Sequence, residues 1–407
     1  MLRLRGSLDI KEAWSMENRE PRTNYMKRPE IRFGIIGLGL MGKEFASAVA
    51  RWCHLLDELP VPVINGICNR SNLADRKWFT ENFPGIKIVT SNYTDLLSSD
   101  LIDAVYCAVP HNLHEEYYIK IIEAGKHLLG EKPFGIDLDA NEHILRTLNN
   151  HPEIIVRCSS EFVYLPGAKR IIDWIRGKKY GTIMEVKCGF YHSSDMDMNK
   201  PINWKRMIDI NGEYGCMGDL GFHIHIIPLR MGWYPETVFA DLQKIVTQRP
   251  DHSGKMVPCE TWDNATVICT SRDPDNGKPF TMTFETKRMA PGAMNTWSIE
   301  IYGTEGSAKF STHDPKAFYT LETKGQEQGW TRTEIGAQLF IPTITGKIFE
   351  TGFSDALLQM TGAFMKEFDK NGKPHPFPCG MPEETRWSHR IMTAALESWK
   401  KGQRISL

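Results

Sequence analysis

Two short segments carry the side chains best suited to acid–base chemistry. Glu131-Lys132 directly follows a short apolar run, and Asp219 and His223 stand four residues apart. If residues 219–227 form a helix, that spacing places the carboxylate and the imidazole on one face. An ammonium, a carboxylate and an imidazole that converge can hold a substrate oxygen and move its proton. We therefore predict Lys132, Asp219 and His223 as catalytic residues.

A glycine-rich turn offers a site for a reaction partner. The sequence Gly-Leu-Gly-Leu-Met-Gly at 37–42 is a GxGxxG motif that directly follows an expected strand, 31–36, and opens an expected helix. In that context the glycines permit a tight turn, close approach of a pyrophosphate, and close packing of helix on strand. The helix N-terminus supplies free N–H groups. We interpret the motif as a dinucleotide site rather than a simple packing turn, with contacts from Gly37, Gly39, Leu40, Met41 and Gly42.

The end of the second expected strand bears on which dinucleotide binds. Residues 62–68 are followed by Asn69, Arg70 and Ser71, with no carboxylate before Asp75. An Asp or Glu at this place would accept a hydrogen bond from the 2′-hydroxyl of NAD. Arg70 and Ser71 suit a 2′-phosphate instead, although Arg70 could also stack on adenine and serve either cofactor. We expect NADP or NAD, with a slight preference for NADP.

Short apolar runs alternate with helical periods from residue 31 to 158. This alternation predicts an α/β domain with a doubly wound parallel sheet of the Rossmann type, covered by helices on both faces. Ligands collect at the carboxyl ends of the strands in such sheets. Two polar segments follow expected strands there, and we expect cofactor contacts from Pro110, His111, Asn112, His114, Glu131 and Lys132. His111 and His114 could equally be polar groups at the start of a helix.

The pattern changes after about residue 158. Runs such as 184–190 alternate apolar and polar residues, and few helices separate them, which predicts an α+β domain on a large open, mostly antiparallel sheet. We expect four parts along the chain. They are a flexible arm (1–30), the Rossmann domain (31–158), a substrate and oligomerisation domain (159–380), and a C-terminal helix and tail that pack back on the N-terminal domain (381–407).

Composition argues against several classes of partner. Lys and Arg number 49 against 50 Asp and Glu, so no basic excess favours nucleic acid or an anionic membrane. The nine cysteines are scattered without a CxxC pair, and the first 30 residues lack the apolar core of a secretory signal. We expect a cytoplasmic protein with no nucleic-acid or membrane partner. We also expect no metal, because His223 and His225 diverge on a helix.

Taken together, these segments resemble the glucose–fructose oxidoreductase, inositol dehydrogenase and MocA family. The resemblance covers nearly the whole chain from residue 31. It implies a Rossmann domain followed by an open-faced sheet domain often used for oligomer contacts. It also implies catalytic roles for Lys132, Asp219 and His223. The motifs that carry it are the glycine turn, Pro-His-Asn-x-His (110–114), Ala-Gly-Lys-His-Leu-Leu-Gly-Glu-Lys-Pro (124–133), Asp-x-Gly-x-His (219–223) and Ile-Tyr-Gly-Thr-Glu-Gly (301–306).

The segments around the expected substrate pocket only partly follow that family. Members often carry an Arg three residues before the proline that here is Pro166, whereas this chain has Val163 and adds a carboxylate at Glu161. Trp204-Lys205 resembles a Trp-Arg pair that lines the pocket in relatives. We expect substrate contacts from Glu161, Tyr164, Trp204 and Lys205, beside Lys132, Asp219 and His223.

The resemblance implies an NAD(P)-dependent oxidoreductase acting on a secondary alcohol or ketone of a sugar, cyclitol or related polyol. His223 would take the hydroxyl proton, Lys132 would bind the same oxygen, and Asp219 would orient His223 or bind substrate hydroxyls. A homo-oligomer, dimer or tetramer, is expected through the open sheet. Two alternatives stay open: redox-neutral glycoside cleavage through a transient keto-sugar, and a non-catalytic dinucleotide sensor.

Overall fold

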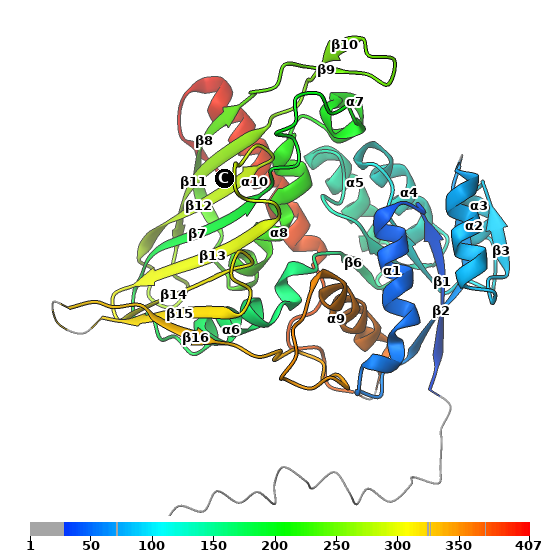
Figure 1. The fold of residues 1–407 in the computed structure, drawn as a ribbon, viewed down its shortest axis with the longest axis horizontal. Coiled ribbons are helices and arrows are strands. Elements are labelled where there is room, and N and C mark those ends of the chain that lie inside the picture. Colours follow the sequence, from blue (N-terminus) through cyan, green and yellow to red (C-terminus); the bar gives the residue numbers. More distant parts are fainter. Residues whose placement is uncertain (1–27, 71, 324, 326, 371) are drawn as a thin grey trace, which may run out of the picture.

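The apolar runs of the first half form a six-stranded parallel sheet in the order β3-β2-β1-β4-β5-β6 (Figure 1). The computed structural model describes residues 28–407 except 71, 324, 326 and 371, so most of the expected N-terminal arm lies outside it. Its strands are β1 (Glu30–Ile36), β2 (Val61–Cys68), β3 (Ile88–Thr90), β4 (Ala104–Cys107), β5 (His127–Gly130) and β6 (Val156–Cys158). Its helices are α1 (Leu40–Ala50), α2 (Leu73–Asn82), α3 (Thr94–Leu97), α4 (His114–Glu123) and α5 (Leu138–Asn149).

A nine-stranded sheet forms the second domain, in the order β16-β15-β14-β13-β7-β12-β11-β8-β17. Every neighbouring pair is antiparallel except β7 and β12, which run parallel at the centre of the sheet. Beside it, β9 (Gln248–Pro250) and β10 (Met256–Pro258) form a separate hairpin. The nine strands are β7 (Ile183–Tyr191), β8 (Pro235–Gln243), β11 (Asn264–Arg272), β12 (Pro279–Lys287), β13 (Thr296–Gly303), β14 (Gly306–Ser311), β15 (Ala317–Glu322), β16 (Thr331–Glu334) and β17 (Ile405–Ser406).

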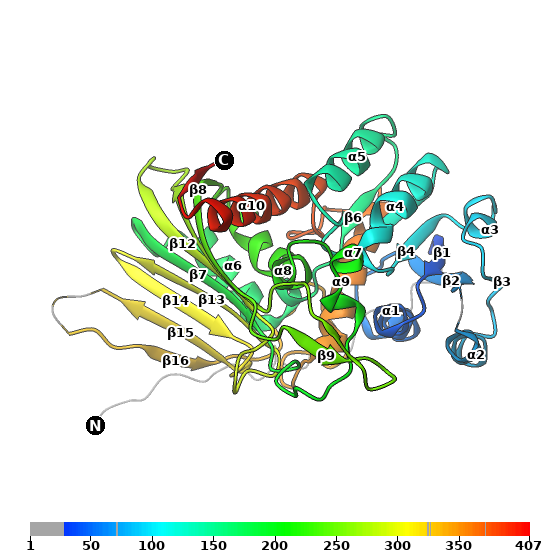
Figure 2. The ribbon, with the colours of Figure 1, turned by 90° about the horizontal axis from the view of Figure 1, so that it is seen from above.

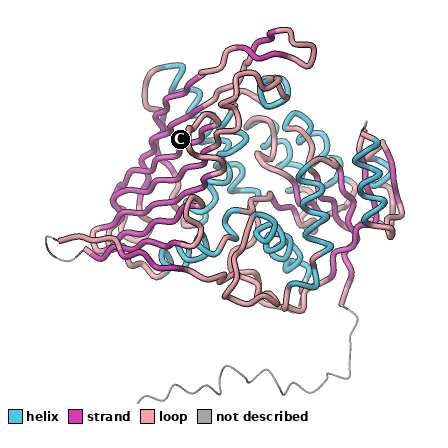
Figure 3. Tube along the Cα trace, viewed as in Figure 1, coloured by secondary structure: helices cyan, strands magenta, loops and turns pink. Residues whose placement is uncertain are grey.

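Helices cover one face of the large sheet and separate it from the first domain (Figure 2). They are α6 (Pro166–Arg176), α8 (Cys216–Arg230) and α10 (Pro382–Lys401). Nearly every residue of α8 is buried, because it packs against the sheet on one side and against α10 on another. Figure 3 shows the opposite face of the sheet as strands alone within the described residues. The fold class predicted from the sequence is confirmed.

Two segments differ from the expected division of the chain. Helix α9 (Phe353–Met365) falls within the region assigned to the substrate domain, yet it packs against α1 of the Rossmann domain. The Phe364 ring lies 6.2 Å from that of Phe33. Helix α10 contacts α5 but also β8, and β17 after it pairs with β8. The tail therefore returns to the second sheet, because β8 would otherwise leave its edge unpaired.

The described part of the chain contains no helix with both the length and the apolar character that crossing a bilayer requires.

Candidate active site

A cavity of about 590 Å³ opens where the carboxyl ends of the parallel strands face α8. The first domain contributes residues that follow β1, β4, β5 and β6, which is where an open parallel sheet collects ligands. The second domain contributes the end of β7, the segment before α7 (Ile208–Asn211), and α8. Its wall includes Gly39, Leu40, Met41, Val109, Pro110, Glu131, Lys132, Glu161, Phe162, Phe190, His192, Trp204, Lys205, Asp219, His223 and Asn295.

The three residues predicted to be catalytic meet in this cavity. The Lys132 ammonium, which follows β5, donates to Oδ1 of Asp219 at 2.9 Å and to its main-chain oxygen at 2.6 Å. His223 lies one turn farther along α8 in the same wall. Its Nδ1 is 3.2 Å from Oγ of Ser160. The proposed role for Asp219 in orienting His223 is therefore not what the structure supports, because Ser160 holds the imidazole and Asp219 holds the ammonium.

Asp219 is the centre of a cluster of three cations. Besides Lys132, Lys205 donates to Oδ2 at 2.9 Å and Arg288 at 2.5 Å. A buried carboxylate is costly unless it is paired. Burial pushes the pKa of Asp219 upward, but Arg288, Lys132 and Lys205 outweigh it and hold that pKa well below its usual range. Asp219 is thus ionised, and it fixes the position of each cation around the cavity.

The pKa values of the two lysines that pair with Asp219 are shifted in opposite directions. Burial alone would lower the pKa of Lys132, but Asp219, Glu131 and Glu161 raise it above the ordinary lysine value. Burial lowers the pKa of Lys205 to about 8, because Asp219 is opposed there by Arg288 and Lys132. Lys132 therefore stays charged over the whole neutral range, whereas Lys205 loses its proton near pH 8.

The pKa values of His223 and Glu161 are both shifted towards the neutral forms of these groups. Burial, aided by the Lys132 ammonium, lowers the pKa of His223 well below its usual value. A neutral imidazole can accept a proton. Burial and the neighbouring Glu131 raise the pKa of Glu161 to about 7. Glu131 itself accepts a hydrogen bond from the Tyr106 hydroxyl at 2.6 Å.

The glycine turn has the shape that a dinucleotide requires. A Cβ on Gly37 would lie 2.2 Å from the oxygen of Ala108, and one on Gly42 would lie 2.3 Å from the oxygen of Gly37. A Cβ on Gly39 would meet nothing within 4 Å, and Gly39 lines the cavity. No side chain caps the N-terminus of α1, so its N–H groups remain for an anion. These residues fit a pyrophosphate.

The far end of the cradle, beyond β2, contains no free carboxylate among the described residues. Asp75 is 2.7 Å from the ammonium of Lys43 and accepts from Asn72. Arg70 is exposed and interacts with the hydroxyl of Tyr117. Asn69 precedes it, and the expected contact from Ser71 lies outside the described residues.

Three predicted contacts from the segment after β4, His111, Asn112 and His114, lie outside the cavity wall. His111 is buried with Nδ1 3.0 Å from the oxygen of Asn211, and His114 lies between Val109 and Gly135 with a ring stacked on Tyr118. Asn112 is exposed at the start of a helix. Of the two readings for His111 and His114, the structure favours polar groups that fix the start of α4.

The expected substrate contact from Tyr164 is wrong. Its side chain is fully buried, and its hydroxyl donates to the main-chain oxygen of Phe377 at 3.2 Å. The 3₁₀ turn that carries it points Glu161 and Phe162 into the cavity and turns Tyr164 into the core instead.

Sequence reasoning missed His192, Arg288 and Ser160. His192 follows β7 and Arg288 follows β12, and these two strands pair in parallel with Lys287 opposite Tyr191. Their carboxyl ends therefore meet at one edge of the sheet. The signal was two alternating runs that each end in a basic residue, but their pairing across about a hundred residues of sequence is not a local property.

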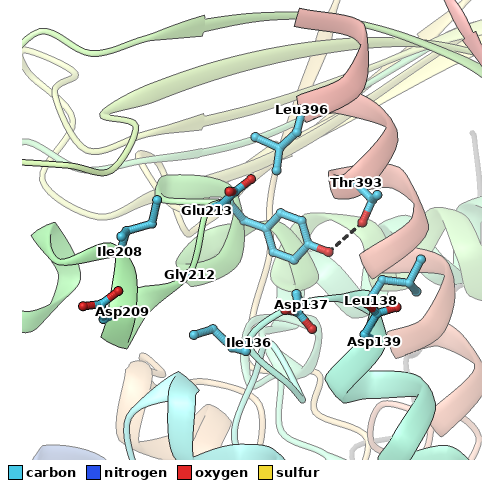
Figure 4. A pocket seen from close by; sticks show the side chains of 11 residues that line it. Ile136, Asp137, Leu138, Asp139, Ile208, Asp209, Gly212, Glu213, Thr393 and Leu396 are labelled. Atoms are coloured by element: carbon cyan, nitrogen blue, oxygen red, sulfur yellow. Dashed lines mark hydrogen bonds between the residues drawn. The ribbon is translucent and has the colours of Figure 1, made fainter. Parts of the chain in front are cut away.

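A second cavity, of about 460 Å³, lies at the start of α5, against α7 and α10 (Figure 4). The Tyr214 hydroxyl is 2.7 Å from Oγ1 of Thr393 across it. Its wall carries four carboxylates and no basic side chain, so it would repel a dinucleotide phosphate. The carboxylates belong to Asp137, Asp139, Asp209 and Glu213.

Both domains match known sequence families. The "Oxidoreductase family, NAD-binding Rossmann fold" matches residues 31–157, and the "GFO/IDH/MocA C-terminal domain" matches residues 168–309. Together the two matches span about two thirds of the chain.

Several characterised proteins are similar to this chain. Levoglucosan dehydrogenase of Pseudarthrobacter phenanthrenivorans is 24% identical over 289 residues, which cover 69% of this chain and 73% of that protein. Glucose-6-phosphate 3-dehydrogenase of Bacillus subtilis is 23% identical over 72% of this chain and 77% of its own. A structure of levoglucosan dehydrogenase with NADH and L-sorbose superimposes with a TM-score of 0.81 at 22% identity, covering 93% of this chain and 99% of that one. The likeness to that structure establishes the shared fold.

Proposed function

The chain belongs to the GFO/IDH/MocA family of NAD(P)-dependent oxidoreductases, and from that membership we propose that it transfers hydride between nicotinamide and a secondary alcohol or ketone of a sugar or related polyol. One observation carries the proposal. Lys132 and His223, a charged donor and a neutral acceptor, share a cavity with Gly39 of the dinucleotide cradle. A binding module has no need of that pair.

The chain's own residues supply the acid–base part of the reaction. A bound nicotinamide supplies the hydride acceptor or donor. Lys132 donates a hydrogen bond to the reacting oxygen and stabilises the negative charge that develops on it. His223 accepts the hydroxyl proton through Nε2, since Ser160 engages Nδ1. Asp219 acts as a positioning residue, because it fixes the Lys132 ammonium through two contacts.

The substrate class follows from the polarity of the cavity and from the relatives. Glu131, Glu161, Lys205 and Asn295 add polar groups around Lys132, as a molecule with several hydroxyls would need. The relatives named above are dehydrogenases of levoglucosan and of glucose 6-phosphate. Phe162 and Phe190 provide apolar walls against which a sugar ring can lie.

We also propose which of the two nucleotides, NAD or NADP, the protein prefers. The family is an NAD-binding one. Arg70 and the engaged Asp75 favour NADP within it, because no described carboxylate is free to accept from a ribose 2′-hydroxyl. We keep the slight preference for NADP as a prediction.

A homo-oligomer through the open sheet is also proposed. Ile268 and Phe239 are register partners on β11 and β8, and both are more than one third exposed on a face that no described helix covers. An aromatic and an aliphatic side chain side by side on such a face suit a second copy of the chain. Sedimentation of the protein should give a mass of at least two chains.

A panel of polyols, sugars and glycosides with NAD⁺ and NADP⁺ tests the proposal through the absorbance of reduced nicotinamide. Accumulation of reduced nicotinamide in proportion to oxidised sugar is the expected result. Cleavage of a glycoside without accumulation would replace the proposal by redox-neutral chemistry. Tight nucleotide binding without any turnover would replace it by a sensor.

A further inference from the structure

A further hollow, distinct from the acidic cavity at the start of α5, continues the catalytic cavity away from the glycine turn. It measures about 430 Å³ and shares His192, Trp204, Lys205 and Asp219 with the catalytic cavity. Because the walls are shared, one ligand can occupy both spaces. The residues that line only this hollow are Ser194, Asp195, Lys200, Asn203 and Arg288.

Cations outnumber carboxylates around this hollow. Asp195 is paired with Arg206 at 2.6 Å and Lys200 at 3.0 Å, and Arg206 also pairs with the buried Asp263. Asp219 receives Lys205 and Arg288 and is shared with Lys132 of the catalytic cavity. Among the residues that line the hollow, the cations Lys200, Lys205 and Arg288 therefore face only two carboxylates, and Asp219 is also shared with Lys132. The space carries an excess of positive charge.

Arg288 adds an unused donor to that excess. Its side chain is only 5% exposed, and its Nε is buried without a hydrogen-bond partner. A buried donor without a partner is costly. The lowered pKa of Lys205, which burial and the Arg288 and Lys132 cations bring to about 8 against the pull of Asp219, is consistent with the same positive field. An anion in the hollow would counter this field.

The loop that bears Lys200 is fixed in place before any ligand arrives. Arg249, in the β9–β10 hairpin, is 1% exposed and donates to the main-chain oxygens of Asp195 at 2.5 Å, Asp197 at 2.6 Å and Lys200 at 3.1 Å. A loop held by one guanidinium loses little freedom on binding. Lys200, 37% exposed, stands at the mouth of the hollow as the cation that a ligand can recruit.

We propose that this hollow recognises an anionic substituent of the sugar, a carboxylate or a phosphate, so that sugar acids or sugar phosphates are the preferred substrates. The inference rests on the proposed function for the identity of the sugar part. Both anions are pure acceptors that pair with ammonium and guanidinium groups through charge-assisted hydrogen bonds. Lys200 and Lys205 present such groups from the connection between β7 and α7, and Arg288 presents one from the end of β12.

Calorimetric titration of the full-length protein with bound NADH tests this directly. The ligands are hexoses, each with its uronate and its 6-phosphate. At least one anionic form should bind about tenfold or more tightly than its neutral parent, as the gain of a charge-assisted contact implies. The advantage should shrink with rising salt. Comparison of uronate with phosphate identifies which anion the hollow takes.

A matched pair of variants locates the effect. Lys200→Gln should reduce the preference for the anionic over the neutral sugar about tenfold, since one charge-assisted contact is lost. Lys178→Gln is the control, because Lys178 also pairs with a carboxylate, Asp275 at 2.7 Å, and lines neither cavity. It should leave the preference unchanged.

Equal affinity for neutral and anionic sugars throughout the panel overturns the inference, as does an unchanged preference in Lys200→Gln. Failure of the proposed function gives a different result. Anionic sugars could bind with the stated preference while no sugar changes the redox state of the nucleotide. That result would support the anion site and contradict the proposed dehydrogenase activity.

Discussion

The two walls of the catalytic cavity are built in different ways. On the Rossmann side the cradle is formed by backbone: Gly39 leaves open space, and the uncapped N-terminus of α1 faces it. On the α8 side the wall is formed by charged side chains, with Asp219 holding Lys132, Lys205 and Arg288. The first wall selects by shape and the second by charge. Substitutions in each should therefore fail in different ways.

Within the charged wall, Lys132 and Lys205 differ in the direction of their pKa shifts. Both ammonium groups lie 2.9 Å from a carboxylate oxygen of Asp219, yet the pKa of Lys132 is raised and that of Lys205 is lowered to about 8. Glu131 and Glu161 also raise the pKa of Lys132. Arg288 opposes Lys205. A permanent charge is thus placed where the reacting oxygen is expected, and a titratable one stands beside it.

The largest expected effect comes from Lys132→Met. Loss of the ammonium should lower kcat by about 10³-fold, the magnitude typical of removing a donor to a developing oxyanion. The affinity for NADH, measured by fluorescence titration, should change little, because the cradle is made by other residues. Lys126→Met removes a half-buried ammonium that donates to the oxygens of Ser99 and Ile102 outside the cavity. It should keep normal turnover, and a fully active Lys132→Met enzyme would mean that Lys132 does not stabilise the reacting oxygen.

Gly39→Val tests the wall that selects by shape. The new side chain would occupy the open space of the cradle, so the Kd for NADH should rise about 100-fold, which corresponds to about 2.7 kcal/mol. Stability should be preserved, since a Cβ at this position meets nothing within 4 Å. Gly85→Val, another position with open space, is the control and should bind NADH normally. Unchanged affinity in Gly39→Val would place the dinucleotide elsewhere.

The pH dependence of kcat/KM should be set by Lys205 of the charged wall. Because its pKa is lowered to about 8, the ammonium is present below that pH and lost above it. Because Asp219 then loses one of its cations, kcat/KM should fall about fivefold between pH 8 and one unit above it, as a single titration with that pKa predicts. Lys205→Arg should remove this fall, since a guanidinium stays charged. Lys169→Arg, paired with Asp173 on the surface, should retain it.

The smallest effect is expected at the outer end of the cradle. Arg70→Ala should raise the KM for NADP⁺ about fivefold, the size expected of an exposed charge pair, and leave the KM for NAD⁺ unchanged. Arg146→Ala, on the exposed side of α5, serves as control. An equal rise for both nucleotides would mean that Arg70 stacks on adenine and reads no phosphate.

The parts of the site that the sequence predicted are those coded locally. The glycine turn, with its strand before and helix after, needs only consecutive residues, and the spacing of Asp219 and His223 needs only a helix. The roles on that helix were not predictable, because they depend on Ser160 and Arg288 from distant segments. His192 and Arg288 meet only through the parallel pairing of β7 and β12.

Closeness in sequence did not predict which side chains share the cavity where a turn lies between them. Tyr164 stands three residues after Glu161, but the 3₁₀ turn between them sends one side chain into the core and the other into the cavity. The position of α9 on α1 was equally hidden, since the apolar face of an amphipathic helix does not state which partner it packs against.

A crystal structure of the protein with NADH and a bound sugar would show whether the two walls of the cavity hold the dinucleotide and the reacting oxygen. We expect the pyrophosphate to lie against Gly39 and the N-terminus of α1. We also expect the reacting sugar oxygen to lie within hydrogen-bonding distance of both Lys132 Nζ and His223 Nε2. A dinucleotide bound away from Gly39, or a sugar oxygen that neither side chain reaches, would contradict this expectation.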